Sequence, residues 1–120
     1  MKGVFLDRDG VINELIYYEE AGIIDSPFTA EQFHLLPGAG KAIRRLNDSG
    51  FIVLVVSNQP GVAKNHFSLM TLEQMDYKMT REISVDGAHI DRVYYCPHHP
   101  EGKNPAYRKV CKCRDGRAHV

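Results

Sequence analysis

The chain has 120 residues, of which 43% are hydrophobic and 25% are charged, as expected of one soluble globular domain and not of a disordered segment. Fifteen basic residues balance fifteen acidic ones, so nucleic acid is not expected as the main partner. No apolar run approaches the roughly 20 residues that span a bilayer, and no signal peptide precedes the first predicted strand, so we expect a cytoplasmic protein without membrane association.

The first predicted strand, residues 4–6, leads directly into Asp7-Arg8-Asp9-Gly10. Residues i and i+2 of a strand point to the same side, so the two carboxylates can converge beyond its carboxyl end, where open α/β sheets bind ligands. Two close acids repel each other, which favours a bound cation or a shared proton. One carboxylate can then be a nucleophile and the other a proton carrier, with Mg²⁺ between them. The alternative interpretation is a solvated Asp-Gly turn.

Residues 10–37 show no helical period and contain two prolines, so we expect a long excursion, such as a small hairpin or flap with a functional role. The elements that follow are a helix over 38–49, a continuously apolar strand over 51–56, a helix over 71–85 and a strand over 90–95. Thr71 and Gln74 fit a capping box for the second helix. The core-facing stripe of that helix is predicted to be Leu72, Met75, Met79 and Ile83. This order predicts right-handed crossovers and a parallel sheet covered by helices on both faces.

A second polar motif, Ser57-Asn58-Gln59-Pro60, follows the second buried strand. The carboxyl ends of parallel strands lie at the same edge of a sheet, so this motif is expected to share a crevice with the two aspartates. The Ser57 hydroxyl, the Asn58 amide and backbone N–H groups can bind the oxygens of a phosphoryl group. Taken alone, the motif is also compatible with an ordinary turn.

Two short pairs of metal-ligating residues, Cys96-x-His98 and Cys111-x-Cys113, flank a loop of 12 residues. Three cysteines are a poor basis for disulfides, whereas Cys₃His is a usual set for a closed tetrahedral zinc site. With four protein ligands zinc has no open position, so its role is expected to be structural. His99 is an alternative ligand, and free cysteines with a surface histidine are the alternative interpretation.

The strings FLDRDGVIN, SNQPGVA and CPHHPEG…CKCR, in this order, resemble the haloacid dehalogenase (HAD) superfamily of phosphatases. The similarity is to the subgroup of heptose-bisphosphate 7-phosphatases, with histidinol-phosphate phosphatases as near relatives. It implies an α/β fold: one HAD-like domain over 1–120, with a three-layer Rossmann-like parallel sheet and a zinc-stapled loop. It also implies a Mg²⁺-dependent phosphoric monoester hydrolase of carbohydrate metabolism, acting on D-glycero-D-manno-heptose 1,7-bisphosphate through an aspartyl-phosphate. The long loop between the zinc pairs favours this substrate over histidinol phosphate, which stays an alternative.

The resemblance also implies a role for each site residue. Asp7 would be the nucleophile, and Asp9 the acid that protonates the leaving group and then activates water. Both would bind Mg²⁺, Asp9 through its backbone carbonyl. The residues expected to contact the sugar phosphate are Arg8, Leu15, Ile16, Tyr17, Tyr18, Ser57, Asn58, Gln59, Pro60 and Arg114.

The chain departs from the family pattern after Arg114. The family continues CRKPxPG, whereas Asp115 stands here where a lysine would neutralise the phosphoryl group. The sequence ends at Val120, before the strand that carries the acidic Mg²⁺ ligands, so we expect an HAD domain incomplete at its C-terminus. The family is mostly monomeric, but an unpaired first strand would favour association. The alternatives are a truncated or degenerate homologue with zinc, weak phosphate binding and little activity, and a zinc-stapled module that binds nucleic acid.

Overall fold

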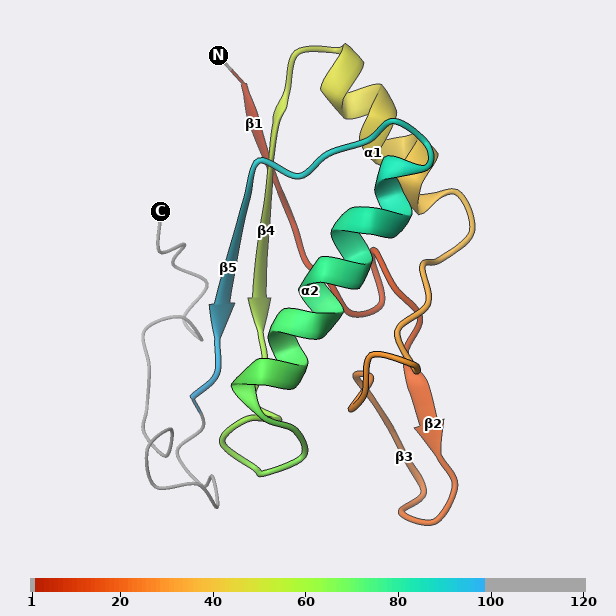
Figure 1. Cartoon of the computed structure of the whole chain (residues 1–120), viewed down its shortest axis with the longest axis vertical. Coiled ribbons are helices and arrows are strands. Elements are labelled where there is room, and N and C mark those ends of the chain that lie inside the picture. Colours follow the sequence, from red (N-terminus) through yellow and green to blue (C-terminus); the bar gives the residue numbers. More distant parts are fainter. Residues whose placement is uncertain (1, 99–120) are drawn as a thin grey trace.

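The computed structural model of the chain describes residues 2–98. Its main sheet is parallel, with strand order β1-β4-β5. These strands are β1 (Gly3–Leu6), β4 (Ile52–Asn58) and β5 (Arg92–Cys96). A separate antiparallel pair joins β2 (Ile16–Tyr18) to β3 (Ile23–Asp25), and the helices are α1 (Ala39–Asp48) and α2 (Leu69–Ser84). Each expected element is present, with ends shifted by one or two residues (Figure 1).

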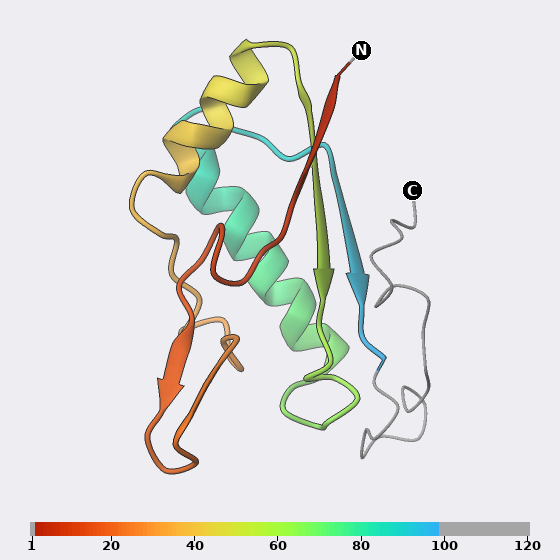
Figure 2. The same cartoon turned by 180° about the vertical axis from the view of Figure 1, so that it is seen from behind.

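Both helices lie on the same face of the main sheet, as the two opposite views show (Figures 1 and 2). The strands β1, β4 and β5 lie side by side in the order in which they occur along the chain. Right-handed crossovers between strands in this order place both connecting helices on the same face of the sheet. On β4 the residues Val53, Val55 and Ser57 are buried, whereas the residues between them are half-buried. The prediction of helices on both faces, and hence of three layers, is therefore wrong for residues 2–98. On the other face Phe5 keeps 53% of its surface exposed.

Helix α2 supplies much of the core. Its four buried residues are the predicted stripe, Leu72, Met75, Met79 and Ile83. The predicted capping box is wrong, because Ser68 precedes the helix and its hydroxyl accepts a hydrogen bond from the Thr71 amide at 3.1 Å. That bond satisfies a free amide of the first turn and fixes the start of the helix at Leu69. Neither α1 nor α2 has the length and apolarity needed to cross a bilayer.

The expected excursion contains a hairpin, β2–β3, on the side of the molecule where β4 and β5 end (Figure 1). Tyr18 holds the hairpin in place: its ring stacks on Phe28 with centroids 4.3 Å apart, and its hydroxyl donates to the Ser26 carbonyl at 2.8 Å. Phe28 in turn contacts Phe67, which follows β4. The hairpin is thus packed against the segment that carries the second polar motif.

Candidate active site

The two polar motifs meet at the carboxyl end of the main sheet, as the sequence predicts. The Gln59 side-chain amide donates a hydrogen bond to Asp9 Oδ2 at 2.6 Å and another to Ser57 Oγ at 3.1 Å. Gln59 itself is held from the neighbouring strand, because its backbone N–H donates to the Cys96 carbonyl at 2.7 Å. Residues 50 positions apart in the sequence therefore form one contiguous polar site.

Asp7 lies directly after β1 and its side chain is exposed. The chain turns sharply behind it: the amides of Val11 and Ile12 both donate to the Arg8 carbonyl, at 3.1 and 2.8 Å. The turn needs a positive φ of 84° at Gly10, a conformation that other residues adopt only with strain. One Asp7 oxygen accepts the adjacent Arg8 amide at 2.7 Å. The turn thus leaves the Asp7 carboxylate facing solvent, open to an incoming group.

Asp9 is in a different environment, because its side chain is only 14% exposed and is held at both oxygens. Oδ1 accepts hydrogen bonds from Arg8 Nε and from Asn13 Nδ2, each at 3.0 Å, and Arg8 Nη2 lies 2.9 Å from the same oxygen. Oδ2 accepts from Gln59. The site therefore pairs one accessible carboxylate with one clamped carboxylate, as a nucleophile and a separate proton carrier require.

Sequence reasoning missed Asn13, which is fully buried and bonds to Asp9. The signal available was its place four residues after Asp9, at the far side of the tight turn. A buried amide at that point has few partners other than the carboxylate that the turn brings beside it.

The side chain of Arg8, a residue expected to contact the substrate, is fully buried beneath the site. Its guanidinium carbon lies 5.5 Å from the ring centroid of Phe33 and 5.5 Å from that of Tyr95. The Tyr95 hydroxyl donates to Asp76 Oδ1 at 3.2 Å. Burial raises the pKa of Asp76 and of Tyr95 above their ordinary values. Sequence reasoning assigned none of these three neighbours to the site.

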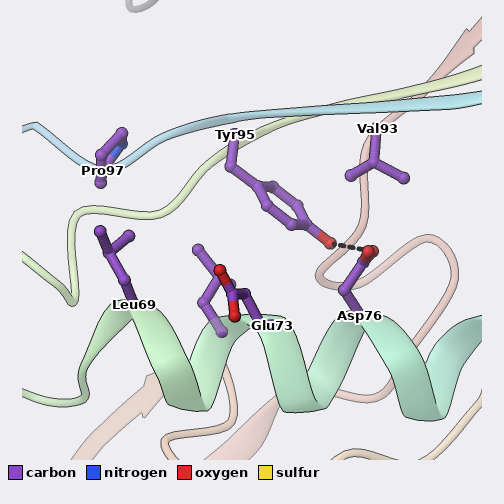
Figure 3. A pocket seen from close by; sticks show the side chains of 7 residues that line it. Leu69, Glu73, Asp76, Val93, Tyr95 and Pro97 are labelled. Carbon is purple, nitrogen blue, oxygen red and sulfur yellow. Dashed lines mark hydrogen bonds between the residues drawn. The ribbon is translucent and has the colours of Figure 1, made fainter.

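A pocket of about 250 Å³ lies between α2 and β5 (Figure 3). Its lining residues are Leu69, Leu72, Glu73, Asp76, Val93, Tyr95 and Pro97. The hydrogen bond between Tyr95 and Asp76 crosses from the strand to the helix at one end of this pocket (Figure 3). Because the Tyr95 ring also contacts the Arg8 guanidinium, the pocket wall and the support of Asp9 share one side chain.

The hairpin residues expected to line the substrate pocket lie at different depths. Leu15 borders the turn, since a Cβ on Gly10 would lie 3.6 Å from Leu15 Cδ1. Ile16 is half-buried and Tyr17 is 63% exposed. Burial raises the pKa of Tyr18, and the Asp25 and Asp9 carboxylates raise it further.

The residues of the second motif also divide by accessibility. Ser57 is buried at 5% exposure and Gln59 at 1%, and their side chains bond to each other. Asn58 is exposed at the end of β4, and Pro60 is half-buried. Asn58 is thus the side chain of this motif that is open to a ligand, while Gln59 is committed to Asp9.

The structure describes only half of the predicted zinc site. Cys96 Sγ lies 3.6 Å from His98 Nδ1, so these two side chains point to a common region. Cys111 and Cys113, like Arg114, lie outside the described residues, and within residues 2–98 no three metal-ligating side chains cluster. The exposed Asp7 carboxylate is a hard oxygen donor of the kind Mg²⁺ prefers. The Asp9 carboxylate is already bonded by three side chains, which fits its backbone carbonyl as the second ligand.

The chain is similar to curated proteins named D-glycero-beta-D-manno-heptose-1,7-bisphosphate 7-phosphatase. It is 37% identical over 120 residues to the one from Haemophilus ducreyi, covering 98% of this chain and 60% of the relative. It is 42% identical over 110 residues to the one from Rhodopseudomonas palustris, covering 92% of this chain and 57% of the relative. The chain therefore spans little more than half the length of these relatives. No protein-family profile matches it.

Solved structures give the same result. The fold matches the crystal structure of D,D-heptose 1,7-bisphosphate phosphatase from B. bronchiseptica, complexed with magnesium and phosphate, with a TM-score of 0.76 and 32% identity over 95% of this chain and 56% of that one. The corresponding enzyme from Burkholderia thailandensis matches with a TM-score of 0.60 and 38% identity, over 80% of this chain and 53% of that one.

Proposed function

We propose that the chain is a member of the HAD-type heptose bisphosphate phosphatases, to which more than nine-tenths of its length is similar, and that it takes part in the Mg²⁺-dependent hydrolysis of a sugar-phosphate monoester. The favoured substrate is D-glycero-D-manno-heptose 1,7-bisphosphate, the substrate in the names of its relatives. The observation that carries the proposal is the contrast between an exposed Asp7 and a clamped Asp9 at one sheet edge. A cytoplasmic location fits such a substrate.

The two carboxylates suit the two steps of a phosphoryl transfer through the enzyme. An Asp7 oxygen attacks phosphorus, the bond from phosphorus to the sugar oxygen breaks, and Asp9 gives its proton to that oxygen. Asp9 then takes a proton from water, the water oxygen attacks phosphorus, and the bond to Asp7 breaks to release phosphate. Asn58, which is exposed at the end of β4, and backbone N–H groups at the same edge would bind the phosphoryl oxygens.

Magnesium would be held by the Asp7 carboxylate and the Asp9 carbonyl, where it would neutralise the charge of the phosphoryl oxygens. We also propose that Cys96, His98, Cys111 and Cys113 hold a structural zinc ion. The support for zinc is the spacing of the four residues and the 3.6 Å approach of the first two side chains.

We expect about one equivalent of Zn²⁺ per chain after purification without chelators, because a Cys₃His set saturates tetrahedral zinc. Binding of structural zinc contributes directly to folding, so a Cys96→Ser variant should lose the metal and melt at a lower temperature. The measurement is elemental analysis together with thermal unfolding. The matched control is Ser84→Cys, which adds an exposed thiol on α2 and should leave the zinc content unchanged. A metal content below about a tenth of an equivalent would contradict the site.

The proposed function is tested by measuring phosphate release from heptose 1,7-bisphosphate and from histidinol phosphate, with Mg²⁺ and with a chelator that removes it. We expect Mg²⁺-dependent release that is faster from the heptose ester. Faster release from histidinol phosphate would reassign the substrate. Zinc-loaded, folded protein that releases phosphate from neither ester would overturn the function and favour a degenerate homologue. The sequence gives a specific reason for that alternative, because Asp115 stands where the family pattern has a lysine.

A further inference from the structure

We propose that the Arg8 side chain is a positioning group that holds the Asp9 carboxylate for proton transfer and does not itself reach the substrate. The inference rests on the proposed function, because it assigns a role to Arg8 within that same reaction. Its starting point is burial: the Arg8 side chain is 0% exposed, so no part of its guanidinium faces the solvent from which a substrate would arrive.

The contacts of Arg8 fix both its position and its direction. Nε donates to Asp9 Oδ1 at 3.0 Å, and Nη2 lies 2.9 Å from the same oxygen. The aromatic rings of Phe33 and Tyr95 each lie 5.5 Å from the guanidinium carbon, at a distance typical of cation–π contacts. Two large rings leave a planar group little freedom to rotate, so the ion pair is held rigidly.

Charge complementarity also favours a fixed Arg8. The guanidinium remains charged under all accessible conditions, and a buried cation needs anionic partners. Asp9 supplies one directly. Asp76 on α2 accepts the Tyr95 hydroxyl, and although burial raises the pKa of Asp76, the Tyr95 hydrogen bond and the Arg8 charge oppose that rise. Through the Tyr95 ring, Arg8 thus links Asp9 to β5, and through the hydrogen bond between Tyr95 and Asp76 it links Asp9 to α2.

The arrangement at Asp9 explains what this positioning achieves. Oδ1 receives the Arg8 and Asn13 donors, whereas Oδ2 receives only Gln59. Because Oδ1 is held by Arg8 and Asn13, Oδ2 is the oxygen with a lone pair left to carry the proton. Without Arg8, two neutral amides would remain to orient the carboxylate, and a proton carrier that is misplaced by about 1 Å loses on the order of 10²-fold in rate.

The kinetic test compares two esters that differ in their need for a proton. A sugar oxygen must be protonated as it leaves, whereas p-nitrophenolate leaves without a proton. Hydrolysis of the aspartyl-phosphate is common to both esters, so the comparison uses kcat/KM, which reports only the steps up to departure of the leaving group. In Arg8→Met, the kcat/KM for heptose bisphosphate should fall on the order of 10²-fold, and the kcat/KM for p-nitrophenyl phosphate should fall less than about threefold. Arg8→Lys keeps the charge but not the planar fork, so it should give a smaller loss with the same selectivity.

The matched control is Arg44→Met, which breaks another Arg–Asp pair, the exposed one between Arg44 and Asp48 on α1. It should leave both activities unchanged. If Arg8→Met does not fold, Arg8→Lys carries the comparison. Equal losses of kcat/KM on the two esters would overturn the inference while the function stands. A parent chain inactive toward both esters would overturn the function, and with it the kinetic role of Arg8.

A second measurement does not depend on activity. In a ¹H–¹⁵N spectrum of the arginine side chains, the buried Arg8 Nε–H should exchange slowly with solvent and should shift when Asp9 is changed to Asn. Asp48→Asn, the matched change at the exposed pair, should shift only the Arg44 signal. An Arg8 Nε–H that exchanges rapidly with solvent, and whose chemical shift does not change in the Asp9→Asn variant, would overturn the pairing itself.

Discussion

Replacing Asp7 by Asn is expected to abolish the proposed phosphatase activity, with a loss on the order of 10³-fold or more. An amide oxygen is a far weaker nucleophile than a carboxylate and cannot form the aspartyl-phosphate. The same change removes the negative oxygen that we propose as a ligand of Mg²⁺. Two functions are therefore lost by exchanging one oxygen for one nitrogen.

The fold should tolerate this change. The Asp7 side chain is exposed, and the hydrogen bond that it makes within the described residues is to the adjacent amide, which an Asn oxygen can also accept. The assay is steady-state phosphate release, with thermal unfolding as the check that Asp7→Asn melts like the parent. Asp48→Asn, an equally conservative change at an exposed aspartate of α1, is the matched control. An Asp7→Asn variant within a factor of about two of the parent would place the chemistry at another residue.

The sequence is a good guide to this site where simple geometric rules apply. Alternation along a strand predicts that Asp7 and Asp9 follow β1 together, and the rule for parallel strands predicts that Gln59 meets them. The hydrogen bond of 2.6 Å between Gln59 and Asp9 confirms the second prediction. Both rules depend on backbone direction alone, which the pattern of apolar residues determines.

The same rules fail where the outcome depends on how side chains pack. Strand alternation says nothing about the direction of the Arg8 side chain once the chain turns at Gly10, and the substrate contact that the resemblance implies for Arg8 does not specify a side-chain or a backbone contact. Its actual direction is set by Phe33 and Tyr95, which come from distant parts of the chain. The third layer expected from the sequence is not found within residues 2–98 for a related reason, because apolar residues on both sides of β4 do not show which element covers each side.

Phe33 illustrates why the excursion was the least predictable segment. It lies in a stretch without helical or strand periodicity, so the sequence gives no reason to place it in the core. In the structure Phe33 is fully buried and packs against the Arg8 guanidinium, whereas Phe5, which lies in a predicted strand, is 53% exposed. A segment that is irregular in the sequence thus provides a central core residue.

This contrast gives the second prediction. Phe33→Ala should lower the free energy of unfolding by about 3–5 kcal/mol, because it removes a fully buried ring and leaves a cavity beside a buried charge. Phe5→Ala, the same chemical change at a half-exposed ring, should cost less than about 1.5 kcal/mol. In urea titrations followed by circular dichroism, the midpoint of Phe33→Ala should fall by roughly 1–3 M. Small domains are commonly stable by only about 5–15 kcal/mol, so Phe33→Ala should be close to unfolding at physiological temperature.

Phe33→Leu separates the two contributions of the ring. Leucine restores most of the buried apolar volume but offers no π face to Arg8, so this variant should recover most of the stability and fall short of the parent by about 1–2 kcal/mol. Its Arg8 Nε–H should exchange faster with solvent than in the parent, because one of the two rings that restrain the guanidinium is gone. If Phe33→Ala were no more costly than Phe5→Ala, the irregular segment would not be part of the core. The support that it gives to Arg8, and through Arg8 to Asp9, would then have to come from Tyr95 alone.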